Sequence, residues 1–248
     1  MAGFKTHVTT STVLGIGYGA AAHLAYGMPL DKSLLAAGLC GVSGMLPDLD
    51  SDSGKPVREM FAFGAAVIPM LMIDRFRHLG MSHESMVLAG GVIYLVIRFG
   101  ISKLFKLYTV HRGMWHSVPA AGVAGLLAFL ICSCESLDER LFKTGAVVLG
   151  FLSHLVLDEI YSFTWDGLLP RRKKSAGTAF KFWNRSSMWS NVSTYGKLVV
   201  LAALAFGDPI LMDRVDKLEH AEKKESETLR VARDWLEDVF SSGNNLKR

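Results

Sequence analysis

The stretch THVTTSTVLGIGYGAAAHLAYGMPL, residues 6–30, decides the fold class. It contains no Asp, Glu, Lys or Arg and is rich in Gly and Ala. A helix needs about 20 apolar residues to cross the hydrocarbon core of a bilayer, so this stretch is long enough to do so. Its small residues, among them Gly15, Gly17 and Gly19, allow the close helix contacts that are typical of membrane bundles. With only Lys5 as a nearby preceding base, we do not expect it to be a cleaved signal peptide.

Further apolar runs follow along the chain and are separated by short charged pieces. They cover residues 33–46, 60–73, 85–97, 118–134, 144–157 and 198–212. Several are apolar on all faces, whereas a helix at the surface of a soluble protein has an apolar stripe. We therefore predict an all-α fold, a multi-pass helical membrane bundle. A soluble all-helical domain is the alternative, because most of these runs are shorter than a bilayer requires.

The C-terminal part of the chain differs in kind. Residues 213–248 contain eight bases and nine acids, while the whole chain has a net charge of +4. Leu229, Ala232, Leu236, Val239 and Phe240 fall on one helical face there, which predicts a charged amphipathic helix. We expect residues 1–212 to form a membrane-embedded helical domain and residues 213–248 a charged cytosolic helical tail, for which binding to a cytosolic protein partner is one interpretation. A solvated accessory helix is the plainer alternative.

The distribution of charge and cysteine limits the function classes. The basic excess lies among the apolar runs, which favours contact with anionic lipid headgroups. We expect no nucleic-acid partner, because no stripe of Arg and Lys interleaved with aromatic residues is present. Cys40, Cys132 and Cys134 lie in apolar runs without the spacing of a zinc knuckle or a redox pair. They are expected to be buried thiols in a reducing compartment.

Ionisable residues at the edges of apolar runs are costly in a membrane protein and mark candidate functional sites. His7 opens the first run, where a capping or interfacial role is the alternative. Asp48 and Asp50 follow Pro47 at the end of the second run. Two carboxylates so close repel each other unless a cation lies between them. A solvated acidic loop, which Asp52 would continue, is the alternative there.

A second candidate group precedes the run at 118–134. His111 and His116 bracket Arg112, and a glycine-containing turn between them can bring both imidazoles onto one ion. Arg112 offers a guanidinium suited to a phosphate or a carboxylate. Ser117 is predicted to cap the helix that Val118 begins.

A third group lies within the run at 144–157 and just after it. His154 and Asp158 are four residues apart, so on a helix they share a face one turn apart. Two ligands of one metal often come from one helix in this way. A hydrogen-bonded pair without a metal is the alternative, although a buried Asp on such an apolar helix is costly unless it is paired or metal-bound.

These groups together give a set of candidate metal ligands, with His83 in reserve. The set is His7, Asp48, Asp50, His111, His116, His154 and Asp158. Seven imidazole and carboxylate donors exceed the four of a structural zinc site and favour a two-metal centre that activates water. Zinc is the first expectation for the metal, while manganese and iron accept similar ligands.

At these residues the sequence resembles the membrane-bound metal-dependent hydrolase family, also described as LexA-binding, inner-membrane-associated hydrolases. The matching motifs are Thr6-His7, Pro47-Asp-Leu-Asp50, His111-Arg-Gly-x-x-His-Ser117 and Gly150-x-x-Ser-His-Leu-x-Leu-Asp158. That family is distantly similar to zinc-dependent phospholipase C and zinc-dependent single-strand nucleases. The resemblance implies phosphoester hydrolysis, which is an argument by analogy. The long interval from Asp50 to His111 and the extension after Asp213 depart from the family pattern.

The resemblance and the ligand types together give our working hypothesis. It is a hydrolase of the bacterial inner membrane in which metal-activated water attacks an ester or phosphoester at the bilayer. Asp48, His111, His116, His154 and Asp158 would be the main ligands, and His7 and Asp50 would complete or bridge a second metal. Asp50 and Arg112 would be the catalytic residues, with Arg112 facing the developing negative charge. One alternative is an interaction or regulatory protein with a structural or vestigial metal site. Another is a small ion transporter that uses its His and Asp groups as a relay.

Overall fold

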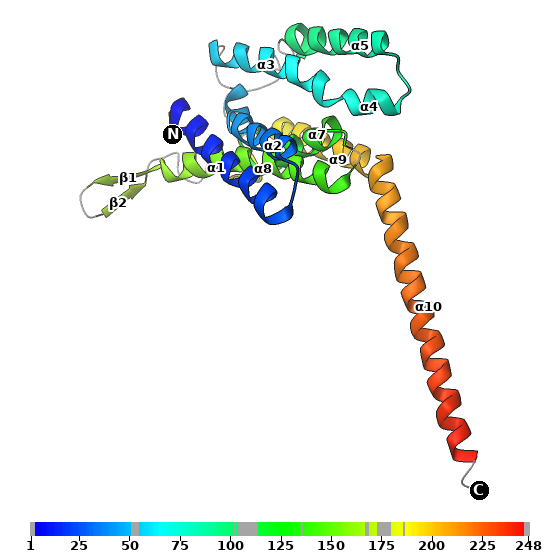
Figure 1. Ribbon diagram of the computed structural model, residues 1–248. Helices are drawn as coiled ribbons and strands as arrows, with labels where there is room; N and C mark the ends of the chain where they lie inside the picture. Colours follow the sequence, from blue (N-terminus) through cyan, green and yellow to red (C-terminus); the bar gives the residue numbers. More distant parts are fainter. Residues whose placement is uncertain are drawn as a thin grey trace. The chain divides into compact units, whose positions relative to one another are not determined.

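The computed structural model describes residues 3–50, 55–101, 103, 114–134, 136–166, 169–172, 180–185 and 187–245. The described part of the chain is almost entirely helical, so the predicted all-α class is confirmed (Figure 1). Its longer helices are α1 (Phe4–Tyr26), α2 (Leu30–Ser43), α3 (Lys55–Leu71), α5 (His83–Leu95), α7 (Val118–Ile131), α8 (Leu137–Ile160), α9 (Met188–Phe206) and α10 (Pro209–Asn245). The one departure is a short antiparallel hairpin of β1 (Phe163–Asp166) and β2 (Leu169–Arg172).

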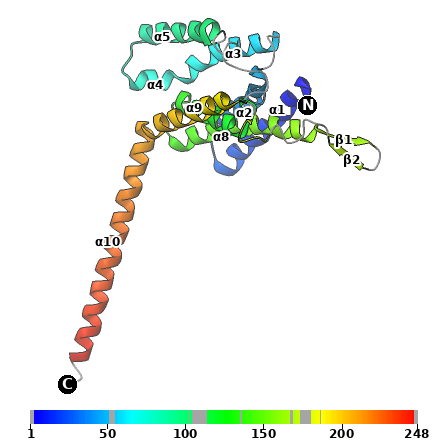
Figure 2. The ribbon, with the colours of Figure 1, turned by 180° about the vertical axis from the view of Figure 1, so that it is seen from behind.

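The first apolar run is divided between two helices. Gly27 takes φ +65°, the left-handed conformation that ends a helix, and the N–H of Met28 donates to the carbonyl of Ala22 at 3.1 Å. Pro29 then precedes α2, so the run at residues 6–30 ends four residues before its predicted limit. The turn folds α2 back against α1, and Figures 1 and 2 show the two helices side by side.

Glycines set how closely α1, α2 and α8 approach one another. A Cβ at Gly19 of α1 would come within 2.7 Å of the carbonyl oxygen of Ser33 on α2. A Cβ at Gly150 of α8 would overlap Ser43 and the carbonyl of Cys40 on α2. Since only a residue without a side chain fits at these positions, glycine permits the close backbone contacts of α1 with α2 and of α8 with α2. This packing brings the start of α1 and the end of α2 to the C-terminal half of α8.

The buried core between α7 and α8 is built from small residues on one side and large residues on the other. Ala120, Ala121, Ala124 and Ala128 of α7 pack on Val147, Phe151 and Leu155 of α8. The alanines let α7 lie close to α8, and Phe151 and Leu155 are fully buried. This contact fixes the N-terminal end of α7 beside the C-terminal half of α8.

A second cluster joins α3 to α5. Val57, Phe61 and Ala65 of α3 pack against Ile97 in η2 (Val96–Ile101), a π-helical continuation of α5. The short helix α4 (Ile73–His78) connects the two longer ones. The outer face of α5 is strongly apolar yet open, with Val87 and Leu88 each 71% exposed. An apolar face of this kind is suited to lipid.

Two helices of the described residues are long and apolar enough to cross a membrane. They are His83–Ile101, which joins α5 to η2, and Leu137–Ile160, which is α8. Residues 6–30, which we expected to be long enough for a span, give the 23-residue helix α1, which is not one of these two helices.

The chain divides into two compact units, Met1–Ala205 and Phe206–Arg248. The predicted run at residues 198–212 is broken at this division, because α9 ends at Phe206 and α10 begins at Pro209. Asp208 caps α10, accepting from the N–H of Ile210 at 3.2 Å. The second unit consists mainly of α10, whose described side chains from Asp213 to Asp234 are all exposed. The predicted location of this tail in the cytosol stays a prediction.

Candidate metal centre

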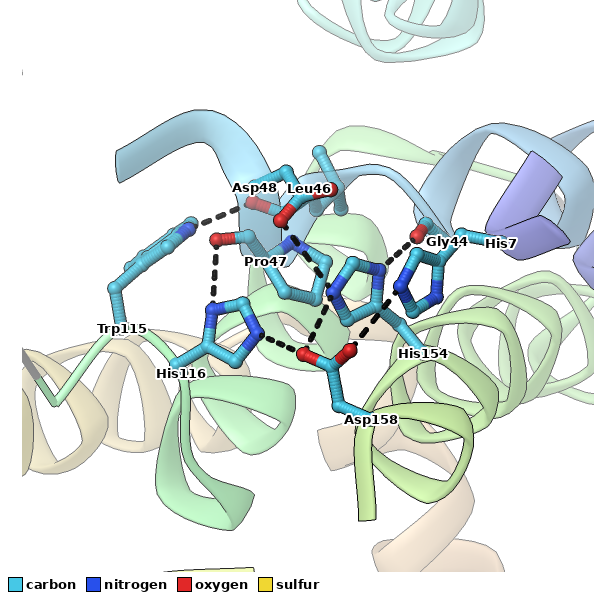
Figure 3. A network of polar contacts seen from close by, with 9 residues as sticks. All are labelled: His7, Gly44, Leu46, Pro47, Asp48, Trp115, His116, His154 and Asp158. Atoms are coloured by element: carbon cyan, nitrogen blue, oxygen red, sulfur yellow. Dashed lines mark hydrogen bonds and ion pairs between the residues drawn. The ribbon is translucent and has the colours of Figure 1, made fainter. Parts of the chain in front are cut away.

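Five of the seven predicted ligands meet at one end of the first unit (Figure 3). His7 lies in the first turn of α1, and Asp48 lies in η1 (Leu46–Asp50), just after α2. His116 directly precedes the N-cap of α7, while His154 and Asp158 occupy the last two turns of α8. Each donor therefore comes from a helix end, and the folding contacts that join these ends also assemble the cluster.

Asp158 is the centre of this cluster. Its Oδ2 lies 3.2 Å from Nε2 of His116 and 3.7 Å from Nε2 of His154. Its Oδ1 lies 3.3 Å from Nε2 of His7. The carboxylate is only 5% exposed, and burying an ionised carboxylate costs several kcal/mol unless partners compensate its charge. The predicted sharing of one helix face by His154 and Asp158 is thus observed, with two further imidazoles added from other helices.

Backbone carbonyls fix the orientation of two of the imidazoles. Nδ1 of His116 lies 3.1 Å from the carbonyl of Pro47, and Nδ1 of His154 lies 2.7 Å from the carbonyl of Gly44. Because a carbonyl only accepts, each Nδ1 carries the proton and donates it. In the neutral ring Nε2 then holds a lone pair, which is the arrangement that proteins use to orient metal-binding histidines.

The remaining nitrogens of the stacked rings lack ordinary partners. Nε2 of His154 is buried without a hydrogen bond and lies 3.5 Å from Oδ1 of Asp48. Nδ1 of His7 is also buried without a hydrogen bond. The ring of His7 stacks on that of His154 with centroids 3.6 Å apart and an angle of 12° between planes. Such buried polar atoms are rare in proteins unless an ion or a water satisfies them.

The donor set fits one divalent cation. Two groups of donor atoms lie within 4.8 Å of one another, one formed by His7, His154 and Asp158, the other by Asp48, His116 and His154. Both need Nε2 of His154, because Nδ1 of that ring is held by Gly44. One nitrogen lone pair binds one ion, so the described side chains provide for a single metal.

The segment that carries His116 is pinned by its neighbours. Nε1 of Trp115 donates to the carbonyl of Leu46 at 2.7 Å, one residue before the Pro47 carbonyl that receives His116. Two consecutive side chains thus hold two consecutive carbonyls of η1, the turn that carries Asp48. Ser117 accepts from the N–H of Ala120, which confirms its predicted role as the cap of α7. The role of Trp115 in holding η1 was not predicted from the sequence, although Trp115 directly precedes the candidate ligand His116.

Several predicted site residues are not placed by the structure. His111, Arg112 and the side chain of Asp50 lie outside the described residues, so the catalytic roles of Arg112 and Asp50 and the two-metal centre stay predictions. His78 and His83 are described and exposed, one at the end of α4 and one at the start of α5. Neither belongs to the two donor groups.

The similarity of the sequence to known proteins covers most of the chain. Residues 1–214 match the family described as YdjM inner membrane protein. No curated protein and no solved structure matches the chain. The matched region contains all five donors of the cluster and ends within α10. Its extent shows that the chain is a membrane-associated protein that belongs to the YdjM inner membrane protein family.

Proposed function

We propose that this protein is a multi-pass, membrane-bound metal-dependent hydrolase that acts on an ester or phosphoester at the bilayer. The observation that carries the proposal is the orientation of His116 and His154. Their Nδ1 protons are used by backbone carbonyls, so in the neutral rings both Nε2 lone pairs face the oxygens of Asp158 and Asp48. Lone pairs and carboxylates at 3.2–3.7 Å repel one another unless a cation lies between them.

A divalent metal satisfies this arrangement better than protons do. His154 is fully buried, so protonating it would place a cationic ring away from water. That ring would stack on His7, and its centroid would lie 5.0 Å from the centroid of the His116 ring. A divalent cation balances the two negative charges of Asp48 and Asp158 while every imidazole stays neutral. No thiolate belongs to either donor group, and donors limited to nitrogen and carboxylate oxygen are typical of catalytic metal sites.

The geometry also favours a site that is open on one side. Four of the five donors are buried, whereas the side chain of Asp48 is 39% exposed. Solvent and substrate would therefore reach the cluster beside Asp48. A bound divalent metal would supply a coordinated water with a pKa near 7. Asp158 and the three imidazoles would hold the ion, and Asp48 would orient the water or accept its proton.

The position of the cluster also bears on the transporter alternative. All five donors lie at helix ends on one side of the first unit, and α8 continues from them for several turns. A proton or ion relay would need ionisable groups along the middle of that helix, and residues 144–153 of α8 contain none. The cluster instead has the form of a single site near one end of the bundle. Its deep burial is compatible with the other alternative, a structural metal site, which the following experiment separates from catalysis.

The test is metal-dependent hydrolysis by the full-length protein in detergent. Purified protein would be stripped with a chelator, reloaded with zinc or manganese, and assayed with nitrophenyl esters, phosphomonoesters and phosphodiesters. Asp48→Asn removes a charge at the open side of the cluster. Asp31→Asn is the matched control, because Asp31 is exposed in the first turn of α2. We expect hydrolysis that needs the metal, survives in the control and is lost in Asp48→Asn. A metal-loaded, folded protein that hydrolyses none of these substrates would favour the structural site.

A further inference from the structure

A short aromatic and basic segment, residues 180–185 together with 187–189, lies outside the metal centre, and its large side chains are exposed. Trp183 is 52% exposed and Trp189 is 72% exposed, and Phe180 and Phe182 are exposed as well. Arg185 lies exposed among them. Large apolar side chains that cluster on an otherwise polar segment mark an interaction surface.

The backbone of this aromatic segment is held in a defined shape. Asn191, which is fully buried, accepts from the N–H of Asn184 and donates its Nδ2 to the carbonyl of the same residue, both at 2.8 Å. The hydroxyl of Tyr195 donates to the carbonyl of Phe182 at 2.6 Å. Since α9 fixes the segment through its own side chains, the aromatic rings keep their outward orientation without a partner protein.

The aromatic segment and the start of α9 are hydrogen-bonded to the residues on either side of His116. The N–H of Met114 donates to Oγ of Ser190 at 3.0 Å. The N–H of Val118 donates to the carbonyl of Lys181 at 3.4 Å. These two bonds flank His116 on either side, so the aromatic segment lies at the same end of the first unit as the metal centre.

The chemistry of the aromatic segment favours one occupant, the headgroup layer of an anionic bilayer. Tryptophan and tyrosine are enriched where a membrane meets water, because their rings are apolar at one side and polar at the other. Residues 180–197 contain three bases and no acid. Such a charge complements anionic headgroups, and each base near the surface contributes on the order of 1 kcal/mol of attraction.

We propose that the aromatic segment lies in the headgroup layer and holds the open side of the metal centre at that depth. The substrate of the proposed hydrolase is then an amphiphile whose ester or phosphoester group lies at headgroup level. This substrate class rests on the proposed function, whereas the placement of the segment does not. A protein partner that covers the aromatic side chains is the outcome that would replace it.

The placement can be tested by measuring depth with nitroxide labels on the full-length protein. The three native cysteines are at most 5% exposed, so introduced cysteines would be labelled selectively. Labels would be placed at Trp189→Cys on the aromatic segment and at Lys5→Cys, two residues before His7. Val92→Cys in the candidate span and Ser226→Cys on α10 give the deep and aqueous references. The protein would be reconstituted in phosphatidylethanolamine and phosphatidylglycerol vesicles and probed with oxygen and a water-soluble nickel complex.

We expect the labels at Trp189 and Lys5 to report similar depths, within about 5 Å of the lipid phosphates. The label at Val92 should lie near the bilayer centre, about 15 Å below the interface. A Trp189 label as open to nickel as that at Ser226, or as deep as that at Val92, would overturn the placement. Depth is measured without metal or turnover, so a failed hydrolysis assay with the expected depths would reject the proposed function and the substrate class alone.

Discussion

Replacing Asp158 by Asn removes the charge at the centre of the cluster while keeping the size of the side chain. The carboxylate lies 3.2 Å, 3.3 Å and 3.7 Å from the imidazoles of His116, His7 and His154 and is 5% exposed. Removing one partner of a buried ionic group costs about 3–5 kcal/mol. If that loss falls on metal binding, at about 1.4 kcal/mol for each factor of ten, metal affinity should fall roughly 10²- to 4 × 10³-fold.

The assay for Asp158→Asn is competition for zinc with a chromophoric chelator, run on detergent-purified protein of unchanged helical content. Asp138→Asn is the control, because Asp138 is exposed in the first turn of the same helix. The control should lose only the small interaction of an acid with a helix N-terminus, about 0.3–1 kcal/mol of stability, and keep its zinc affinity. Zinc affinity in Asp158→Asn within threefold of the wild type would refute a metal held by this carboxylate.

Three further outcomes follow from the packing and the cluster. Gly150→Ala should lower the free energy of unfolding by about 1–3 kcal/mol, because its Cβ would overlap α2. Gly196→Ala is the control, because its Cβ would meet nothing within 4 Å. Equal denaturation midpoints for the two variants would contradict the prediction. Trp115→Phe should cost about 0.5–1.5 kcal/mol for the lost bond to Leu46 and should speed metal release, measured by chelator-induced dissociation; an unchanged release rate would show that Trp115 does not hold η1. Zinc at 100 times its dissociation constant should stabilise the wild type by about 2.7 kcal/mol and should stabilise His154→Ala far less. Thermal unfolding with and without zinc measures both, and equal shifts of the melting temperature would place the metal elsewhere.

Much of the candidate site was predictable because its residues lie in short sequence motifs at the edges of apolar runs. His154 and Asp158 are four residues apart on one apolar helix, and a buried carboxylate at that position needs partners. Asp48 and His116 lie beside Pro47 and Ser117, residues that begin and end helices. These candidate metal ligands could therefore be named from the sequence, whereas the meeting of the helix ends that carry them is seen only in the structure.

The backbone contacts that orient the imidazoles were not predictable, since they depend on the fold. Gly44 and Pro47 contribute carbonyls, which every residue has, and only the fold shows that these two accept from His154 and His116. The division of the first apolar run also escaped prediction. There, Gly27 was one glycine among several in residues 6–30, and its left-handed conformation decided the outcome.

The metal content of the protein as purified without chelators, measured by mass spectrometry beside that of His154→Ala, tests directly whether this cluster holds a metal. We expect about one transition-metal ion per wild-type chain, because His154 offers one nitrogen to both donor groups, and almost none in the variant. A folded wild-type protein that holds no metal and takes up none when zinc or manganese is added would contradict it.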